Sequence, residues 1–106
     1  MAWVILVCAG LLEIVWALFM KKSAGLTLRA PTTIAIISMI ASFALLSVST
    51  RTLPLGTAYT VWTGIGAAGA FLVGIALFGE AATLVRFLAA ALIVAGILVM
   101  KFSSTN

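Results

Sequence analysis

The residue types that carry most enzyme chemistry are missing from this chain. Its 106 residues include no histidine, and the two acidic residues are both glutamates, Glu13 and Glu80, so aspartate is missing as well. Histidine is the commonest general base, and histidine, cysteine and aspartate are usual zinc ligands. We therefore expect no metal site, no cofactor and no enzymatic activity.

Cysteine and charge are also scarce. The single cysteine, Cys8, excludes an intrachain disulfide. It lies within an apolar segment, where a free thiol behaves as a small apolar side chain. Only 8% of the residues are charged, whereas 65% are hydrophobic. A soluble globular domain carries about 25% charged residues, so this composition indicates an integral membrane protein.

The few charged residues leave a formal net charge of +4. In a soluble protein this excess would suggest a nucleic-acid partner. Here the basic residues flank apolar segments, so we interpret them as contacts with the headgroups of the lipid bilayer and as signals for membrane topology. We expect no nucleic-acid partner.

Four apolar runs make up most of the chain. They cover residues 3–20, 32–49, 57–78 and 84–101. Each run is close to the roughly 20 residues that a helix needs to cross a bilayer. Pro31 is well placed at the start of the second helix, and Pro54 lies in a segment that breaks a helix. We predict an all-α integral membrane protein with one domain, residues 1–106, of four transmembrane helices.

The charges at the ends of these runs give little indication of orientation. Four crossings place both termini on one side of the membrane, together with Arg51 and Lys101. The opposite side carries Lys21, Lys22, Arg29 and Arg86. Two basic residues against four is a weak bias for the positive-inside rule. Insertion of the chain in both orientations is compatible with this pattern.

Glu13 is the one charged residue inside the first run. A helix rises about 1.5 Å per residue, so Glu13 would lie near the membrane midplane, where an ionised side chain costs roughly 3 kcal/mol or more. No basic residue lies at its depth. Glu13 is either a structural residue bonded to a neighbouring helix or a carboxylate that binds a mobile cation or proton. We favour the second interpretation.

Several neighbours could complete a cation site around Glu13. On the first helix, Gly10 and Trp16 lie close to the face of Glu13, and Gly10 leaves room beside the carboxylate. Ser42 lies near the middle of the second helix. Its hydroxyl could bond to the carboxylate or to the carbonyl four residues earlier in its own helix, and the sequence does not separate the two.

The third helix begins with aromatic residues and continues with glycines. Tyr59 and Trp62 share a face, where they offer a hydroxyl and a cation–π surface. Gly64 and Gly66 follow at once. Glycines in a membrane helix permit either a bend or close packing, so these two are candidates for a hinge.

The fourth helix carries a series of small residues. Ala89 and Gly96 are one heptad apart and could form a seam for helix association. We interpret this seam as a dimer interface, with ordinary packing inside the monomer as the alternative.

Three segments of the chain resemble one known family. They are residues 10–17 (GLLEIVWA), 22–27 (KSAGLT) and 53–66 (LPLGTAYTVWTGIG). Together they are similar to the small multidrug resistance family of bacterial proton-coupled exporters, over the whole chain. The resemblance implies a multi-pass protein of the inner membrane that forms an antiparallel, dual-topology homodimer. It also implies that Glu13 of both subunits binds protons and substrate in one central site, which Trp16, Ser42, Tyr59 and Trp62 surround.

Within that family the chain resembles the subtype that exports guanidinium. The features that point there are Gly10, Trp16, Ser42 and the subtype marker Lys101. Thr60 is a departure, because this subtype more often has alanine there. A broad exporter of quaternary ammonium and aromatic cations is the alternative within the family. A membrane subunit without transport activity is the alternative from another class.

The chemistry of guanidinium fits these residues. Guanidinium is planar, so a carboxylate can accept two of its N–H groups and aromatic faces can stack on it. The Trp16 indoles of two subunits would narrow the site to a slot for a flat ion. Met39 and Phe43 would form an apolar, adaptable portal for the alkyl tail of a substituted guanidinium, with Thr60 nearby.

Overall fold

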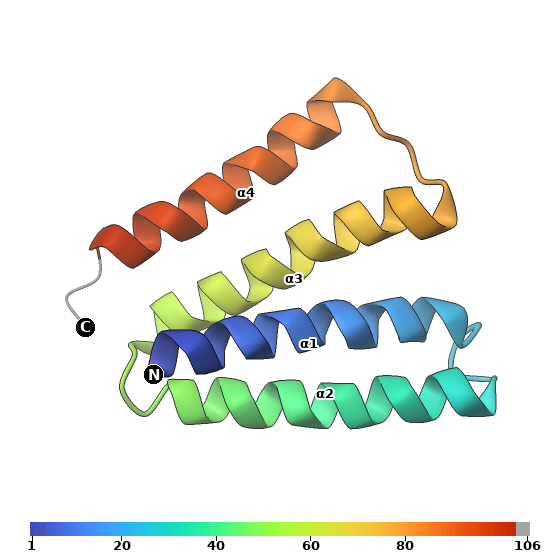
Figure 1. The fold of residues 1–106 in the computed structure, drawn as a ribbon, viewed down its shortest axis with the longest axis horizontal. Coiled ribbons are helices and arrows are strands. Elements are labelled where there is room, and N and C mark those ends of the chain that lie inside the picture. The colour runs from blue at the N-terminus through green and yellow to red at the C-terminus, as the bar shows by residue number, and fades with distance from the viewer. Residues whose placement is uncertain (104–106) are drawn as a thin grey trace.

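The computed structural model describes residues 1–103 and consists of four long helices joined by short loops (Figure 1). The helices are α1 (Ala2–Lys22), α2 (Arg29–Ser49), α3 (Leu55–Phe78) and α4 (Leu84–Ser103). All four are long and apolar enough to cross a membrane. The prediction of an all-α chain with four apolar helices is confirmed, and each predicted run lies inside the corresponding helix.

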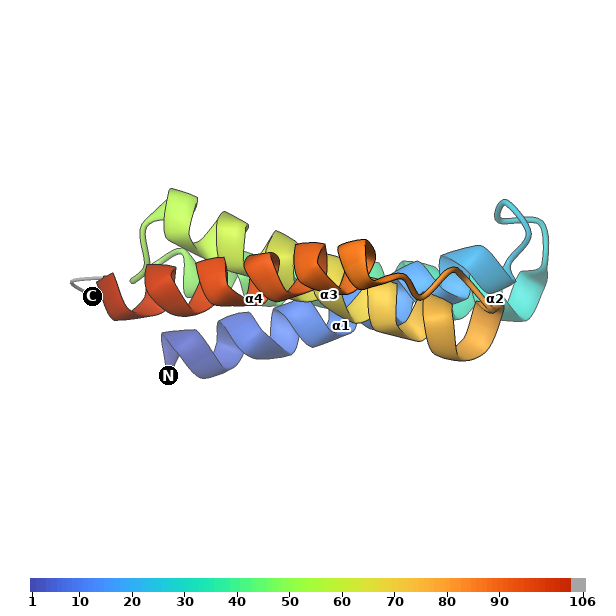
Figure 2. The same cartoon turned by 90° about the horizontal axis from the view of Figure 1, so that it is seen from above.

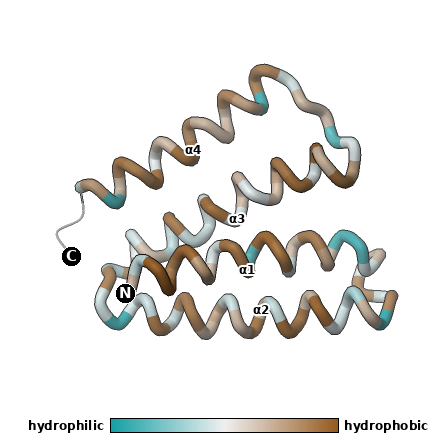
Figure 3. The backbone as a smooth tube through the Cα atoms, viewed as in Figure 1, coloured by the Kyte–Doolittle hydropathy of each residue, from teal (hydrophilic) through white to brown (hydrophobic). Residues whose placement is uncertain are grey.

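The helices begin and end near polar residues, proline or glycine. Figure 3 shows that hydrophilic residues gather mainly at the loops, while the helices are largely hydrophobic. Beyond α1, the Ser23 hydroxyl donates to the Met20 carbonyl at 2.6 Å. Pro31 lies in the first turn of α2, where its missing N–H removes no helical hydrogen bond. Gly79 ends α3 in the left-handed conformation, with φ of 66°, which glycine adopts without steric cost.

Helix α1 is central to the packing. It runs antiparallel to α2 and also packs against α3, whereas α4 packs against α3 alone (Figure 1). Figure 2 shows that the helices form a flat assembly, and its Cα extents are 43 × 34 × 16 Å. None of the residues of α4 is buried. The large hydrophobic side chains of α4 are exposed along most of its length, so the surface that α4 leaves free is largely apolar.

The buried core lies toward the end of the molecule that carries the amino terminus. Its buried residues come from α1, from α3 and from the loop before α3: Leu6, Ala9, Leu53, Ala58, Val61 and Trp62. Small residues let the helices approach closely. A Cβ atom on Gly10 would lie only 2.8 Å from the Ile65 side chain, so α1 and α3 are in contact at this level.

Candidate functional site

The contact between α1 and α3 holds the Glu13 side chain. A Cβ atom on Gly66 would collide with the Glu13 carboxyl group, and one on Gly69 would collide with Ile14. Gly66 and Gly69 of α3 therefore each form a notch that receives a side chain of α1. The Glu13 carboxylate occupies the notch at Gly66 and reaches the backbone of α3.

One oxygen of this carboxylate is enclosed by the protein. Glu13 Oε1 is buried and has no hydrogen-bond partner among residues 1–103. A buried polar atom without a partner is costly, and few exist in folded proteins. Such an atom in the middle of a membrane helix is a strong candidate for a group that takes up a proton or accepts a hydrogen bond from an N–H group of a substrate.

A buried hydrogen-bond network lies one helical turn from Glu13, toward the amino-terminal end of α1. The Ser42 hydroxyl donates to the Ala9 carbonyl at 2.7 Å, and Trp62 Nε1 donates to the Ser42 oxygen at 2.9 Å. This network joins α1, α2 and α3. Ser42 thus uses neither of the two partners expected from the sequence. Because Ala9 is small, α2 approaches α1 closely enough to reach a backbone carbonyl.

Trp62 is the centre of an aromatic group. Its ring lies 5.6 Å from that of Tyr59 and 5.4 Å from that of Phe43, with both pairs tilted. Trp62 is only 6% exposed, whereas Tyr59 and Phe43 are largely exposed. The structure therefore brings together four of the residues expected from the sequence: Ser42, Phe43, Tyr59 and Trp62.

Trp16 and Met39 are not part of this group in the described contacts. Both are partly buried. Trp16 Nε1 is buried without a hydrogen-bond partner among residues 1–103. Trp16 therefore has an unused donor one turn along α1 from Glu13, and its place in the substrate site stays a prediction.

Thr60 and Gly64 lie on the side of α3 that faces α4, and Gly96 lies on α4. They help to line a cavity of about 540 Å³ between α3 and α4, together with Tyr59. A Cβ atom on Gly64 would lie 2.8 Å from Ile97 of α4, whereas one on Gly96 would meet nothing within 4 Å. Ala89 lines a neighbouring cavity between the same helices. The role of Ala89 and Gly96 as a dimer seam stays a prediction.

Helix α3 runs without interruption through its glycines. Gly64 packs against α4 and Gly66 against α1, so both glycines serve close helix packing in this structure. A hinge at these positions stays a prediction.

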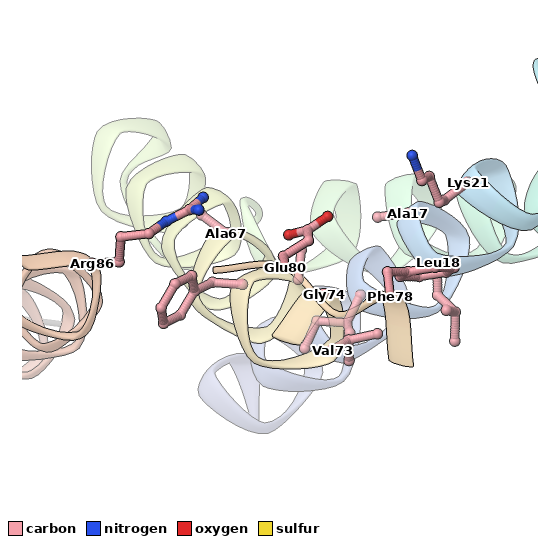
Figure 4. Close-up of a pocket in the computed structure, with 12 residues that line it drawn as sticks. Ala17, Leu18, Lys21, Ala67, Val73, Gly74, Phe78, Glu80 and Arg86 are labelled. Atoms are coloured by element: carbon pink, nitrogen blue, oxygen red, sulfur yellow. The ribbon is translucent and has the colours of Figure 1, made fainter. Parts of the chain in front are cut away.

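The second acid, Glu80, lies in different surroundings from Glu13. It lines a cavity of about 300 Å³ whose wall also includes Lys21 and Arg86. Figure 4 shows the Glu80 carboxylate between these two basic side chains. A Cβ atom on Gly74 would collide with this carboxylate. Glu80 is thus an exposed acid at the helix ends with basic neighbours, and the unaccompanied acid inside the helices is Glu13.

Lys101 connects the two terminal helices at the end of the molecule where α1 begins and α4 ends (Figure 1). Its ammonium group lies 5.2 Å from the centre of the Trp3 ring, within the range of a cation–π interaction. This contact joins the carboxyl-terminal part of α4 to the first turn of α1, although α4 otherwise packs against α3.

Comparison with known proteins identifies the family. The model of the family described as Small Multidrug Resistance protein matches residues 1–94. The chain belongs to the small multidrug resistance family. It is therefore a multi-pass membrane transporter, which in bacteria lies in the inner membrane, and not an enzyme in the usual sense. The resemblance of its three segments to this family is confirmed.

Relatives within the small multidrug resistance family share most of the sequence. The chain is 54% identical over 104 residues to proteins named "Guanidinium exporter" from Citrobacter freundii and Klebsiella oxytoca, and the match covers 98% of this chain and 99% of each relative. The protein of the same name from Yersinia pestis is 51% identical, with 98% of this chain and all of the relative covered.

One buried polar residue of this small multidrug resistance protein escaped the reasoning from sequence. Ser38 of α2 is 8% exposed and lies one helical turn from Ser42 on the same face. The spacing of four residues between two serines in an apolar helix was the signal that could have identified it.

Proposed function

We propose that this chain is a proton-coupled antiporter that exports guanidinium and small guanidinyl cations. The observation that carries the proposal is Glu13, an acid in the middle of an apolar helix whose buried Oε1 has no hydrogen-bond partner among the described residues. The name "Guanidinium exporter" carried by its relatives supports the choice of substrate.

The geometry of the site suits a flat cation with several N–H donors. A guanidinium ion that approaches Glu13 can donate two parallel hydrogen bonds to the two carboxylate oxygens. The faces of Tyr59 and Trp62 offer cation–π stacking one to two turns away. Trp16 and Gly10 would shape the remaining wall of the site.

Coupling follows from competition for the same oxygens. A proton on Glu13 removes the negative charge that binds guanidinium, and bound guanidinium excludes the proton. If the empty, ionised protein cannot change the side to which it opens, each outward movement of substrate requires an inward movement of protons. Antiport then needs no second site.

We further propose that the working unit is an antiparallel homodimer with both Glu13 carboxylates in one site. Larger transporters build their site between two inverted repeats, and two copies of opposite orientation supply the same symmetry. The apolar outer face of α4 and the weak charge bias support this arrangement. Ala89 and Gly96 would belong to its seam, Gly64 and Gly66 to its hinge, and Met39, Phe43 and Thr60 to its portal.

Export of quaternary ammonium or aromatic cations is the second candidate function. The observation that favours it is the 540 Å³ cavity beside Tyr59 and Thr60, whose lining is mostly apolar. A cavity of this size can accommodate a bulky apolar substituent.

Proton release on binding tests the proposal. Addition of guanidinium to the purified protein in weakly buffered detergent solution should release protons and acidify the solution. Glu13→Gln should abolish the release, whereas Glu80→Gln, the same chemical change at the other acid, should leave it intact. If the wild-type protein binds guanidinium without releasing protons, the antiport mechanism is wrong. A larger release with a tetraaryl cation than with guanidinium would favour the second candidate.

A further inference from the structure

A second serine of α2 lies buried beside the candidate site. Ser38 is 8% exposed, and its hydroxyl takes part in none of the side-chain hydrogen bonds within residues 1–103, which include those of Ser42 and Ser49 in the same helix. A serine in a membrane helix normally bonds to the preceding turn of its own helix or to a neighbouring helix. Ser38 does neither here and has a free donor.

The register of α1 and α2 places Ser38 opposite Glu13. The hydrogen bond from Ser42 to the Ala9 carbonyl fixes which turns of the two helices face each other. Because α1 and α2 run antiparallel, four residues forward from Ala9 and four residues back from Ser42 lead in the same direction (Figure 1). The two steps arrive at Glu13 and Ser38, each about 5.4 Å further along its helix.

Glu13 also points toward the gap between α2 and α3. Around the axis of α1, Glu13 falls between Ala9, whose carbonyl bonds to α2, and Gly10, which contacts Ile65 of α3. Its carboxylate now rests against Gly66 of α3. A rotation of the side chain away from Gly66 would turn the carboxylate toward α2.

Ser38, whose hydroxyl has no acceptor among residues 1–103, thus lies at the same level of the helix pair as Glu13, whose Oε1 has no donor there. We propose that the Ser38 hydroxyl donates a hydrogen bond to the ionised Glu13 carboxylate and turns it out of the Gly66 notch into the substrate site. Ser38 is then a positioning residue for cation binding. This inference rests on the proposed function, because it concerns the state of Glu13 that binds guanidinium.

The pH dependence of guanidinium binding distinguishes this role from packing. A hydrogen bond to the charged form of an acid favours that form, so its loss gives protons an advantage over guanidinium. Ser38→Ala should move the midpoint of guanidinium binding to higher pH by about one unit, the shift expected for one hydrogen bond to a charged group. Ser38→Thr, which keeps a hydroxyl, should restore the wild-type midpoint.

Two further variants keep the test decisive. Ser38→Gly also lacks the hydroxyl and should shift the midpoint as Ser38→Ala does, so that misfolding of one variant does not prevent a conclusion. Ser47→Ala removes an exposed hydroxyl of the same helix and should change nothing. Binding is measured by calorimetric titration of the purified, monodisperse protein with guanidinium at a series of pH values.

The possible results separate this inference from the proposed function. If guanidinium binding by the wild type depends on pH and Ser38→Ala leaves the pH midpoint of binding unchanged, Ser38 does not position Glu13, and the proposed function stands. If Ser38→Thr shifts the midpoint as far as Ser38→Ala, the serine acts through packing and the inference is wrong. If binding by the wild type does not depend on pH, the proposed function fails and this inference fails with it.

Discussion

At the scale of single residues, the site depends on where side chains are absent as much as on where they are present. Gly66 has no Cβ, and the Glu13 carboxylate occupies the space that a Cβ would take. In the same way, the Ile14 side chain occupies the space that a Cβ atom of Gly69 would take. An acid that sequence alone places near the membrane midplane thus obtains its surroundings from the backbone of a neighbouring helix.

Substitution of Gly66 should therefore act on Glu13 directly. Gly66→Ala introduces a methyl group where the carboxyl group lies, so the Glu13 side chain could no longer return to this notch after it leaves the substrate site. Overpacking of this kind costs about 1–3 kcal/mol, so we expect guanidinium export in proteoliposomes to fall by about fivefold or more. The matched control is Gly56→Ala in the same helix, where the added Cβ meets nothing within 4 Å. Equal activity of both variants would show that the notch is not needed.

The residues of the site also show which of its features could be predicted from the sequence. The importance of Glu13 followed from its depth in an apolar run, which needs only the helical rise and the cost of a buried charge. The partner of Ser42 did not follow, because it depends on how α1 and α2 are aligned, and sequence periodicity contains no information on that alignment. For the same reason, the sequence could not decide whether Gly66 serves as a hinge or as a site of close helix packing.

At the scale of helices, α4 is the element held least firmly. It packs only against α3, and none of its residues is buried. The boundaries of α4 could be predicted from its hydropathy, as could those of the other helices. Its separation from α1 and α2 could not, because an apolar face has the same sequence pattern whether it contacts protein or lipid.

Removal of the Lys101 charge should loosen α4. The cation–π contact with Trp3 is the described side-chain link from α4 to α1, and it should contribute about 0.5–1 kcal/mol at this exposed position. In Lys101→Met, amide hydrogens near the end of α4 should exchange several-fold faster, as measured by mass spectrometry in detergent. Lys22→Met is the control, because the Lys22 ammonium group lies over the Phe19 ring of the same helix, α1, and this contact links no helices. Unchanged exchange in Lys101→Met would mean that Trp3 does not hold α4.

At the scale of the whole molecule, a flat group of four helices leaves two features unexplained by one copy. The face of α4 lacks a protein partner among residues 1–103, and the basic residues are distributed two against four between the two membrane sides. A partner of opposite orientation accounts for both. The single chain would then supply half of a symmetric transporter.

The charge distribution offers a test of this orientation. In a Cys8→Ala background, a reporter cysteine at exposed Thr52 in the loop between α2 and α3 should react with a membrane-impermeant maleimide from both membrane faces in comparable amounts. Arg51→Ala leaves one basic residue against four, so the four-base side should become more strongly cytoplasmic and labelling of Thr52→Cys should shift to the outside. Arg29→Ala, which removes a base from the other side, should not produce this shift.

Because an antiparallel pair needs both orientations, export per chain should fall with Arg51→Ala and not with Arg29→Ala. Labelling of the background protein from one face only would exclude the antiparallel homodimer and leave a parallel or a heteromeric dimer. In a parallel homodimer the two Glu13 carboxylates could not be related by an axis in the membrane plane.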